Sequence, residues 1–316
     1  MATNLLPTLK DILLAHNRIR PFVHRTPVLT SVSINEILGA EFFFKCENFQ
    51  KVGAFKFRGA TNAVLSLTPE ELARGVGTHS SGNHAAALAL AARNAGVPAY
   101  IVMPRTAPEI KKIAVAGYGG IITYCEPTLE ARETTMAKVQ QQTGCTFIHS
   151  FNRFEIIAGQ GTAAVEFLED IPDLDTIMAP VGGGGLLSGT AIAAKSIKPD
   201  ITVWAGEPAN ADDAFRSVQS GSIQSAVPPN TIADGLLTSL GPLTFEVIRN
   251  RVDRILLCPE PTITEAMRLI WERMKIIIEP SSAVPLGALM ANPDGGWKGK
   301  KIGIILSGGN CQLKLA

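Results

Sequence analysis

Residues 176–197 read Thr-Ile-Met-Ala-Pro-Val-Gly-Gly-Gly-Gly-Leu-Leu-Ser-Gly-Thr-Ala-Ile-Ala-Ala-Lys-Ser-Ile. Residues 177–181 form an apolar run of strand length, and residues 186–197 have the alanine-rich pattern of a helix. The two are joined directly by four glycines, Gly182, Gly183, Gly184 and Gly185. A strand that turns straight into a helix is the unit of a parallel sheet with crossover helices, so this stretch predicts an α/β fold.

The same alternation continues on both sides of this unit. A short strand after Gly75 is expected to end at residues 78–80, and further strands are expected at 99–103, 121–125 and 146–149. Helices at 83–95, 108–117 and 129–142 separate them. Beyond the glycines, strands are expected at 201–206 and 302–306, and Thr262 with Glu265 predicts a capping box at the start of a further helix. The chain therefore predicts two α/β lobes, the smaller of them entirely parallel.

Composition narrows the classes of partner. The chain has 316 residues, with 29 Lys plus Arg against 28 Asp plus Glu and a formal net charge of +1. Such a length favours two lobes, and the balanced charge favours a small molecule over nucleic acid or an anionic membrane. Charged residues interrupt residues 1–21, which favours a docking helix over a signal peptide or a membrane span. Five scattered cysteines are typical of reduced thiols in the cytoplasm.

The four glycines are also a candidate anion site. At the start of a helix the backbone amides converge, and the helix dipole favours negative charge. A plain turn needs one or two glycines and each further glycine costs folding entropy, so phosphate binding is favoured over a structural turn. No Gly-Lys-Ser/Thr follows as in a nucleoside-triphosphate loop, and the glycine spacing does not fit a dinucleotide fingerprint.

A second candidate is a lysine between two aromatic residues. Residues 48–60 read Asn-Phe-Gln-Lys-Val-Gly-Ala-Phe-Lys-Phe-Arg-Gly-Ala, so Lys56 follows a glycine turn and lies between Phe55 and Phe57. An apolar environment lowers a lysine pKa and makes the neutral amine accessible for a Schiff base. On this stretch alone, a solvated surface lysine is the commoner case.

A third candidate is the stretch Ser-Ser-Gly-Asn-His at residues 80–84, where a strand is expected to end and a helix to begin. Helix N-terminal amides, together with Ser80 and Asn83, suit both oxygens of a carboxylate. By itself the stretch is more typical of an ordinary helix N-cap followed by a solvated histidine.

Together these motifs resemble one family. Gly-Ala-Phe-Lys-Phe-Arg-Gly-Ala around Lys56, the Ser-Ser-Gly-Asn-His loop, the tetraglycine and the Ser-Gly-Gly-Asn of residues 307–310 are similar to the fold type II pyridoxal-phosphate enzymes. Within that family the chain resembles the group of serine racemase and the serine, threonine and hydroxyaspartate dehydratases, also through residues 157–162, 207–213, 232–235 and 271–275. The resemblance covers nearly the whole chain.

The resemblance implies an architecture and a place for the cofactor. Two open α/β lobes with parallel sheets, like the tryptophan synthase β fold, would hold pyridoxal 5′-phosphate between them. Residues 1–67 and 151–316 would form the large cofactor-binding lobe, and residues 68–150 the small lobe that grips the substrate. A cytoplasmic homodimer is implied by the family.

The resemblance also assigns roles to single residues. Lys56 would hold the cofactor covalently, Phe55 would pack by its ring, and Asn83 would bind its ring hydroxyl. The phosphate would bind at Gly182, Gly183, Gly184, Gly185 and Leu186. Ser307 would face the pyridine nitrogen. Because a hydroxyl does not hold a pyridinium as a carboxylate does, Ser307 predicts a weaker electron sink and chemistry that relies on loss of a β-leaving group.

The activity implied is loss of the β-hydroxyl from a 3-hydroxy amino acid, giving a 2-oxo acid and ammonia. The Lys56 amine would take the α-proton on one face, and Ser81 would move a proton on the other face. Ser80, Ser81, Asn83 and His84 would bind the substrate. The same arrangement supports racemisation of serine, so a principal serine racemase is left open as an alternative.

Two positions bear on the choice of substrate. Arg132 matches an arginine that faces the distal end of the substrate in this group, and Thr238 stands where serine is usual. A second carboxylate would bind there, which makes threo-3-hydroxyaspartate a candidate beside L-serine and L-threonine. An ion pair with Glu130 is the alternative for Arg132. Phe151 stands where threonine dehydratases also carry a phenylalanine. Ala86 replaces a glutamine that serves the nucleotide site of the animal enzymes, so activation by ATP is not expected.

Glu207 and Asp213, with the carbonyl of Ala211, match the divalent-cation site of the group. Two carboxylates and a carbonyl make a hard oxygen site for Mg²⁺, Ca²⁺ or Mn²⁺, and an acidic helix start is the alternative.

Two rival functions remain. One is a β-replacement synthase, whose substrate loop usually reads Thr-Ser-Gly-Asn-Thr, and the other is a non-catalytic pyridoxal-phosphate-binding protein.

Overall fold

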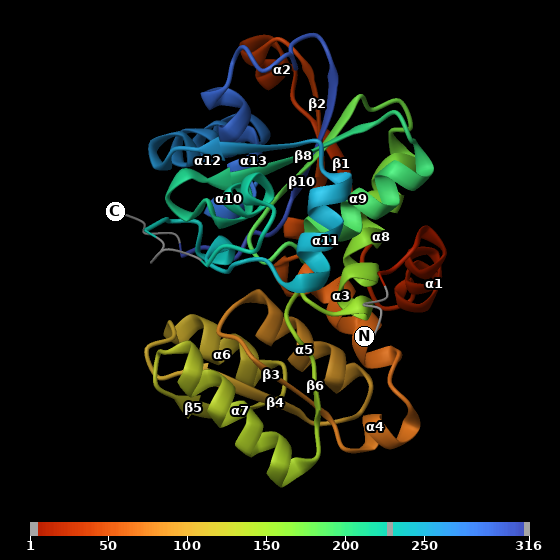
Figure 1. Cartoon of the computed structure of the whole chain (residues 1–316), viewed down its shortest axis with the longest axis vertical. Coiled ribbons are helices and arrows are strands. Elements are labelled where there is room, and N and C mark those ends of the chain that lie inside the picture. The colour runs from red at the N-terminus through yellow and green to blue at the C-terminus, as the bar shows by residue number, and fades with distance from the viewer. Residues whose placement is uncertain (1–5, 226–229, 313–316) are drawn as a thin grey trace.

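The structure, a computed structural model, describes residues 6–225 and 230–312. Strands and helices alternate along the chain and form two sheets, so the predicted α/β fold class is confirmed. Figure 1 shows the sheets in separate lobes, the smaller sheet below and the larger one above. Among these described residues, no helix is both long enough and apolar enough to cross a membrane.

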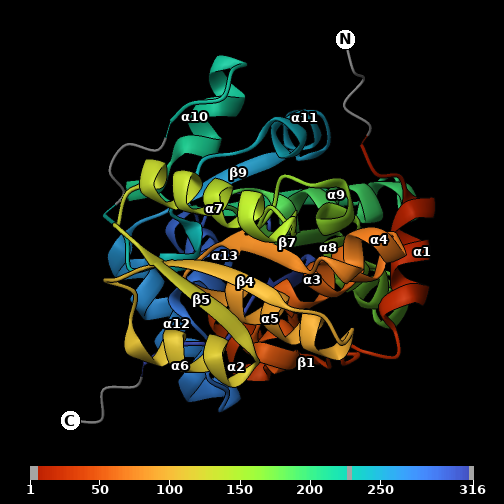
Figure 2. The same cartoon turned by 90° about the horizontal axis from the view of Figure 1, so that it is seen from below.

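The smaller sheet has the strand order β5-β4-β3-β6, and every pair in it is parallel. Its strands are β3 (Val76–His79), β4 (Ala99–Pro104), β5 (Gly120–Cys125) and β6 (Thr146–Phe147). The connecting helices are α5 (Asn83–Asn94), α6 (Glu109–Gly117) and α7 (Leu129–Thr143). Figure 2 shows α7 on one face of this sheet and α5 with α6 on the other. All four strands lie within the predicted small lobe, residues 68–150, whose exact limits stay a prediction.

The larger sheet has the strand order β1-β2-β10-β7-β8-β9, and only β1 runs antiparallel to its neighbour. Its strands are β1 (Val28–Thr30), β2 (Glu41–Cys46), β7 (Thr176–Pro180), β8 (Thr202–Pro208), β9 (Arg254–Cys258) and β10 (Lys301–Leu306). The helices of the rest of the chain are α1 (Leu9–Ile19), α2 (Val32–Leu38), α3 (Lys56–Leu65), α4 (Pro69–Ala73), α8 (Phe154–Asp170), α9 (Gly185–Ile197), α10 (Asp213–Ser220), α11 (Pro242–Arg251), α12 (Glu260–Met274) and α13 (Pro280–Ala291).

One predicted helix start is wrong. The capping box expected at Thr262 and Glu265 is absent, because α12 begins three residues earlier, at Glu260, with Pro259 at the N-cap. Pro261 falls in the first turn, where the missing amide hydrogen of proline costs no helical hydrogen bond. Thr262 therefore lies inside the helix and caps nothing.

Helix α3 packs into both lobes. Its residues Phe57, Ala60 and Val64 are fully buried and join the alanine-rich face of α5 in the core of the smaller lobe. On its other side α3 contacts α8, where the Asn62 side-chain amide donates to the Glu155 carbonyl at 2.7 Å. Burying Phe57 or Val64 is worth about 1.5–3 kcal/mol each, so the helix that begins at Lys56 is held from two directions.

Candidate active site

Lys56 lies at the start of α3, after a turn in which Val52 and Gly53 both have positive φ. Its Nζ donates to the Ser150 carbonyl at 3.0 Å and lies 5.1 Å from the centre of the Phe55 ring. Burial lowers the pKa of Lys56 to about 8, and the charge of Glu279 opposes this shift. The amine has the reactive character expected for a Schiff-base lysine. Of the two flanking aromatics only Phe55 is next to it, since Phe57 points into the core.

A buried charge cluster fixes the first turn of this helix. The Arg58 guanidinium donates to Glu47 with two hydrogen bonds of 2.8 Å and to Glu166 with two more of 2.8 Å. Lys45 completes the cluster, with its Nζ 2.8 Å from Glu166. All four side chains are at most 3% exposed. The cluster balances two positive and two negative charges and ties α3 to β2 and to α8.

Ser307 lies against the Lys56 loop although about 250 residues separate them in sequence. The Ser307 carbonyl accepts from the Phe55 amide at 3.0 Å, and Ala54 pairs with Gly308 in an isolated bridge. The hydroxyl of Ser307 is 3.1 Å from that of Ser282, at the start of α13. The end of β10 therefore brings the terminal Ser-Gly-Gly-Asn motif beside the reactive amine.

Asn83, at the start of α5, is held by residues of the other lobe. Its side-chain nitrogen donates to the two carboxyl oxygens of Glu279 at 3.1 and 3.0 Å, and its oxygen accepts from Asn310 at 3.0 Å. Burial raises the pKa of Glu279 to about 7, and the hydrogen bond from Asn83 opposes this rise. Sequence reasoning missed Glu279. A lone acid after the run Ile276-Ile277-Ile278 was the available signal, because an acid next to buried apolar residues needs a partner.

The Ser-Ser-Gly-Asn-His loop differs from an ordinary helix N-cap followed by a solvated histidine. Gly82, which has no side chain, is the N-cap of α5, and Ser80 only accepts a long 3.4 Å bond from the Gly82 amide. His84 is buried rather than solvated, with Nε2 3.2 Å from the Ile148 carbonyl. Burial lowers the pKa of His84 to about 3, so the ring is neutral and Nε2 donates. Its Nδ1 is left as a buried acceptor with no partner among the described residues.

The tetraglycine connects β7 to α9 and is fully buried. No side chain caps α9, because its N-cap is Gly184 in the left-handed region at φ 85°. Close packing also requires glycine here, since a Cβ on Gly183 would lie 2.3 Å from the Phe151 ring. The amides of Gly183 and Gly184 donate to no atom within the described parts of the chain. A buried helix start with unpaired donors suits an anion.

Arg132 lies on α7 and is half-exposed. It makes no ion pair with Glu130 or any other acid in residues 6–225 and 230–312, and its buried Nε has no hydrogen-bond partner there. Burial lowers the pKa of His79 and raises that of Cys125, and the Arg132 charge acts on both. Since His79 directly precedes Ser80, Arg132 lies near the serine loop. Thr238 is exposed in the segment between η4 (Asp234–Leu236) and α11.

Glu207 and Asp213 meet at the start of α10. The carboxyl oxygens of Glu207 accept from the amides of Ala214 and Phe215 at 2.7 and 2.8 Å. Burial raises the pKa of Glu207 to about 8 and that of Asp213 to about 6. Ala211 closes the preceding η3 (Ala209–Ala211), and Asp213 Oδ2 is buried without a partner in the described chain. Two buried acids with an unpaired oxygen fit a hard cation. No cluster of three His, Cys, Asp or Glu side chains suited to a metal exists among the described residues.

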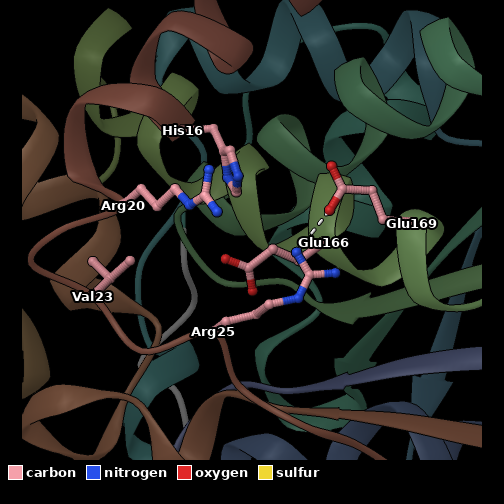
Figure 3. A pocket seen from close by; sticks show the side chains of 6 residues that line it. All are labelled: His16, Arg20, Val23, Arg25, Glu166 and Glu169. Carbon is pink, nitrogen blue, oxygen red and sulfur yellow. Dashed lines mark hydrogen bonds and ion pairs between the residues drawn. The ribbon is translucent and has the colours of Figure 1, made fainter.

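A cavity of about 170 Å³ lies apart from these residues (Figure 3). Its lining consists of His16, Arg20, Val23, Arg25, Glu166 and Glu169. Figure 3 shows Arg25 paired with Glu169 in this lining, and Glu166 also belongs to the buried cluster around Arg58. The cavity contains none of the predicted site residues.

A family model described as pyridoxal-phosphate dependent enzyme matches residues 19–308. The chain belongs to this family. It is 54% identical over 309 residues to a serine racemase of Dictyostelium discoideum, which covers 97% of this chain and 95% of the relative. It is 50% identical to a β-hydroxyaspartate dehydratase of Paracoccus denitrificans over 98% of both chains.

The fold agrees with that of solved family members. The crystal structure of the D. discoideum serine racemase superposes with a TM-score of 0.93 at 54% identity, covering 97% of this chain and 99% of that one. The chain is therefore a fold type II pyridoxal-phosphate-dependent enzyme of the serine racemase and dehydratase group, as its motifs predicted.

The residues present fit the family's cofactor. Pyridoxal phosphate needs an amine that is neutral near physiological pH, an anion site for its phosphate and a polar neighbour for its ring nitrogen. Lys56 would supply the amine, the uncapped start of α9 the anion site, and the buried Ser307 hydroxyl the polar neighbour. Phe55 contacts both Lys56 and Ser307, and Asn83 is held by Glu279 and Asn310.

Proposed function

We propose that this family member is an ammonia-lyase that removes the β-hydroxyl of L-serine, L-threonine and threo-3-hydroxyaspartate, giving the 2-oxo acid and ammonia, and that it also racemises serine. The similarity to both a serine racemase and a β-hydroxyaspartate dehydratase at 50% identity or above supports this pair of activities. The proposal also takes the enzyme to be a homodimer in the cytoplasm with a divalent cation at Glu207, Asp213 and the Ala211 carbonyl.

The single observation that carries the choice of substrate is the free guanidinium of Arg132. Burying the Arg132 Nε costs desolvation free energy, and no hydrogen bond within the described chain compensates for that cost. A carboxylate is the group that a guanidinium binds best, through two parallel hydrogen bonds. The β-carboxylate of 3-hydroxyaspartate would supply it, while serine and threonine would leave Arg132 unpaired.

The chain's own residues supply the proton transfers. Bound pyridoxal phosphate provides an electron sink for the electron pair left on the substrate's α-carbon. The neutral Lys56 Nζ is the base that takes the α-proton, which its lowered pKa permits near neutral pH. The uncapped start of α9 would hold the phosphate, and Phe151 packs against Gly183 beside it. Residues 181–187 are buried, which would exclude water there.

The substrate's α-carboxylate would bind at the start of α5. The amides of this helix and the hydroxyls of Ser80 and Ser81 offer donors for its two oxygens. The neutral His84 offers an acceptor at Nδ1, which suits a donor group rather than a carboxylate oxygen. His84 would therefore orient a protonated group of the substrate or a bound water.

A second candidate function, principally serine racemisation, is favoured by Ser81. This side chain is partly exposed, and its hydroxyl makes no hydrogen bond within the described residues. A hydroxyl that no neighbour holds is available to give or take a proton on the face opposite Lys56. The two candidates differ in product, because racemisation keeps the hydroxyl group and elimination loses it.

The test of the proposed substrate compares Arg132→Gln with wild type on threo-3-hydroxyaspartate and on L-serine. A lost charge-assisted hydrogen bond is worth about 1.5–3 kcal/mol, so kcat/KM for hydroxyaspartate should fall about 10- to 100-fold. Turnover of serine should change little. Arg105→Gln is the matched control, since Arg105 is an exposed arginine of the same lobe. An equal loss on both substrates would show that Arg132 has a structural role and would contradict the proposal.

A further inference from the structure

The cavity between α1 and α8 is lined mainly by charged and polar side chains. Its volume is about 170 Å³, many times the roughly 10–15 Å³ that a single buried water needs. Figure 3 shows His16 and Arg20 pointing into it from the α1 side, and Glu166 and Glu169 pointing into it from α8. Val23 is the one apolar residue of the described lining. Hydrogen-bond donors and acids therefore face each other across a small polar space.

Of the two arginines in the lining, only Arg20 has no acidic partner in the described chain. Arg25 pairs with both Glu169 and Asp170. The Arg20 guanidinium makes no ion pair or hydrogen bond within residues 6–225 and 230–312. A guanidinium binds a carboxylate through two parallel hydrogen bonds, so the α1 side of the cavity suits a carboxylate.

The α8 side has a carboxylate oxygen that is still open. The Oε2 atom of Glu169 accepts from Arg25 at 2.7 Å, and its Oε1 atom accepts from no residue in the described parts of the chain. Both oxygens of the buried Glu166 already accept from Arg58. An ammonium group has three donors and no acceptor, so the open oxygen of Glu169 suits an ammonium group.

His16 faces the cavity with an unpaired ring, which makes no hydrogen bond to a described residue. Burial lowers the pKa of His16, the charges of Glu166 and Glu169 oppose this shift, and those of Arg58 and Arg25 add to it. A neutral imidazole has one N–H donor and one acceptor. The ring therefore suits an uncharged polar group, such as a hydroxyl.

We propose that this cavity is a second ligand site that binds a small α-amino acid as its zwitterion, with the carboxylate on Arg20 and the ammonium group on the open oxygen of Glu169. A ligand with only negative charge would face the carboxylates of Glu166 and Glu169, and one with only positive charge would face Arg20. A molecule that carries both charges matches both sides. Because Val23 alone offers apolar contact, the site takes glycine or serine in preference to leucine.

The occupant of this cavity is bound but not converted. Lys56 makes its hydrogen bond to the Ser150 carbonyl, in a different part of the molecule from the cavity lining. The inference is therefore independent of the reaction proposed for Lys56.

The test reads the ring-nitrogen resonances of His16 by NMR in the cofactor-loaded enzyme while glycine is added. Glycine has no β-hydroxyl, so it cannot undergo the proposed elimination. The resonance is identified by its loss in His16→Gln, and in wild type it should shift with glycine and saturate. Acetate and methylamine each carry one of the two charges and should bind about 10-fold more weakly. Glycine at the active site would instead move the resonances of His79, His84 and His149, whose charges act on one another near Lys56.

Arg20→Gln should weaken the binding of glycine read at His16 by about 10-fold, which is the effect of one lost charge-assisted hydrogen bond. Arg20 is exposed, so its replacement leaves the core intact. Arg18→Gln is the matched control, because Arg18 is an exposed arginine of α1 that donates to Asn62 and is not part of the lining. It should leave the binding of glycine unchanged.

Three outcomes would overturn the inference. One is a His16 resonance that does not respond to glycine, and another is acetate that binds as tightly as glycine, which would indicate a plain anion site. The third is equal affinity for glycine in Arg20→Gln and wild type. None of these readings depends on turnover, so this inference and the proposed activity fail separately.

Discussion

Replacing Arg58 with methionine removes the centre of the buried charge cluster while nearly keeping its volume. Lys45 stays on Glu166 at 2.8 Å, so that carboxylate keeps one cation. Among the described residues Glu47 keeps only the hydrogen bond from the Thr26 hydroxyl, at 2.6 Å, and it becomes an uncompensated buried charge. Removing one partner of a buried ion pair costs about 3–5 kcal/mol, which is a large share of the roughly 5–15 kcal/mol that stabilises a typical domain.

Urea unfolding of the apoprotein at neutral pH, followed by tryptophan fluorescence, measures this loss. The control is Arg25→Met, which breaks the surface pairs with Glu169 and Asp170. The Arg25 side chain is 50% exposed, so the loss of each pair should cost about 0–1 kcal/mol. The loss in free energy of unfolding caused by Arg58→Met should become smaller as the pH falls. The orphaned Glu47 would have a folded-state pKa above its unfolded value, so its penalty is full above that raised pKa and is relieved on protonation.

A deficit for Arg58→Met within about 1 kcal/mol of that for Arg25→Met would refute the reasoning. It would mean that water or a rearrangement reaches Glu47 and that the cluster does not fix the start of α3. A large deficit that stays the same at acidic pH would also contradict it, since the loss would then come from packing rather than from charge.

Three other predictions follow from single contacts. The rate at which pyridoxal phosphate attaches to the apoprotein should rise with pH and level off above about 8, the pKa of Lys56, and a rise that continues to pH 10 would contradict this. A chelator should lower the melting temperature of wild type but not of Glu207→Gln, because a cation at 100 times its dissociation constant adds about 2.7 kcal/mol of stability. Glu246→Gln, which changes a half-exposed glutamate away from the cation site, should respond like wild type. Gly183→Ala should lower the free energy of unfolding by about 1–3 kcal/mol, because the added methyl group clashes with Phe151. Adding Phe151→Leu to this variant should restore part of the lost stability. No recovery would show that the strain lies elsewhere.

The smaller lobe was the most predictable part of the fold. Its strands are short apolar runs separated by helices with glycine or proline at their ends, so periodicity and stop signals coincide there. Strand β2 was missed because Glu41 and Lys45 interrupt its apolar run, and the partners that let Lys45 be buried, the Thr26 carbonyl and Glu166, are distant in sequence. A buried ion pair of this kind leaves no local pattern.

The residues of the candidate site divide in the same way, into those that belong to local motifs and those whose contacts join distant parts of the chain. Lys56, the serine loop and the glycines were recognisable because each is a local motif. Glu279 was not, because its importance comes from a contact with Asn83 that only the folded chain creates. The N-cap expected at the serine loop was wrong for a related reason, since Asn83 uses its side chain to reach the other lobe instead of capping α5.

The most direct test of the proposed activity is product analysis of the purified, cofactor-loaded enzyme with and without Mg²⁺. L-serine, D-serine, L-threonine and threo-3-hydroxyaspartate would each be supplied, and the 2-oxo acid and the enantiomers of the remaining substrate would be scored together. We predict 2-oxo acid from all three L- or threo-configured substrates, with oxaloacetate from hydroxyaspartate the fastest, and slower formation of D-serine from L-serine. Formation of D-serine with no 2-oxo acid from any substrate would contradict the ammonia-lyase and make racemisation the principal function.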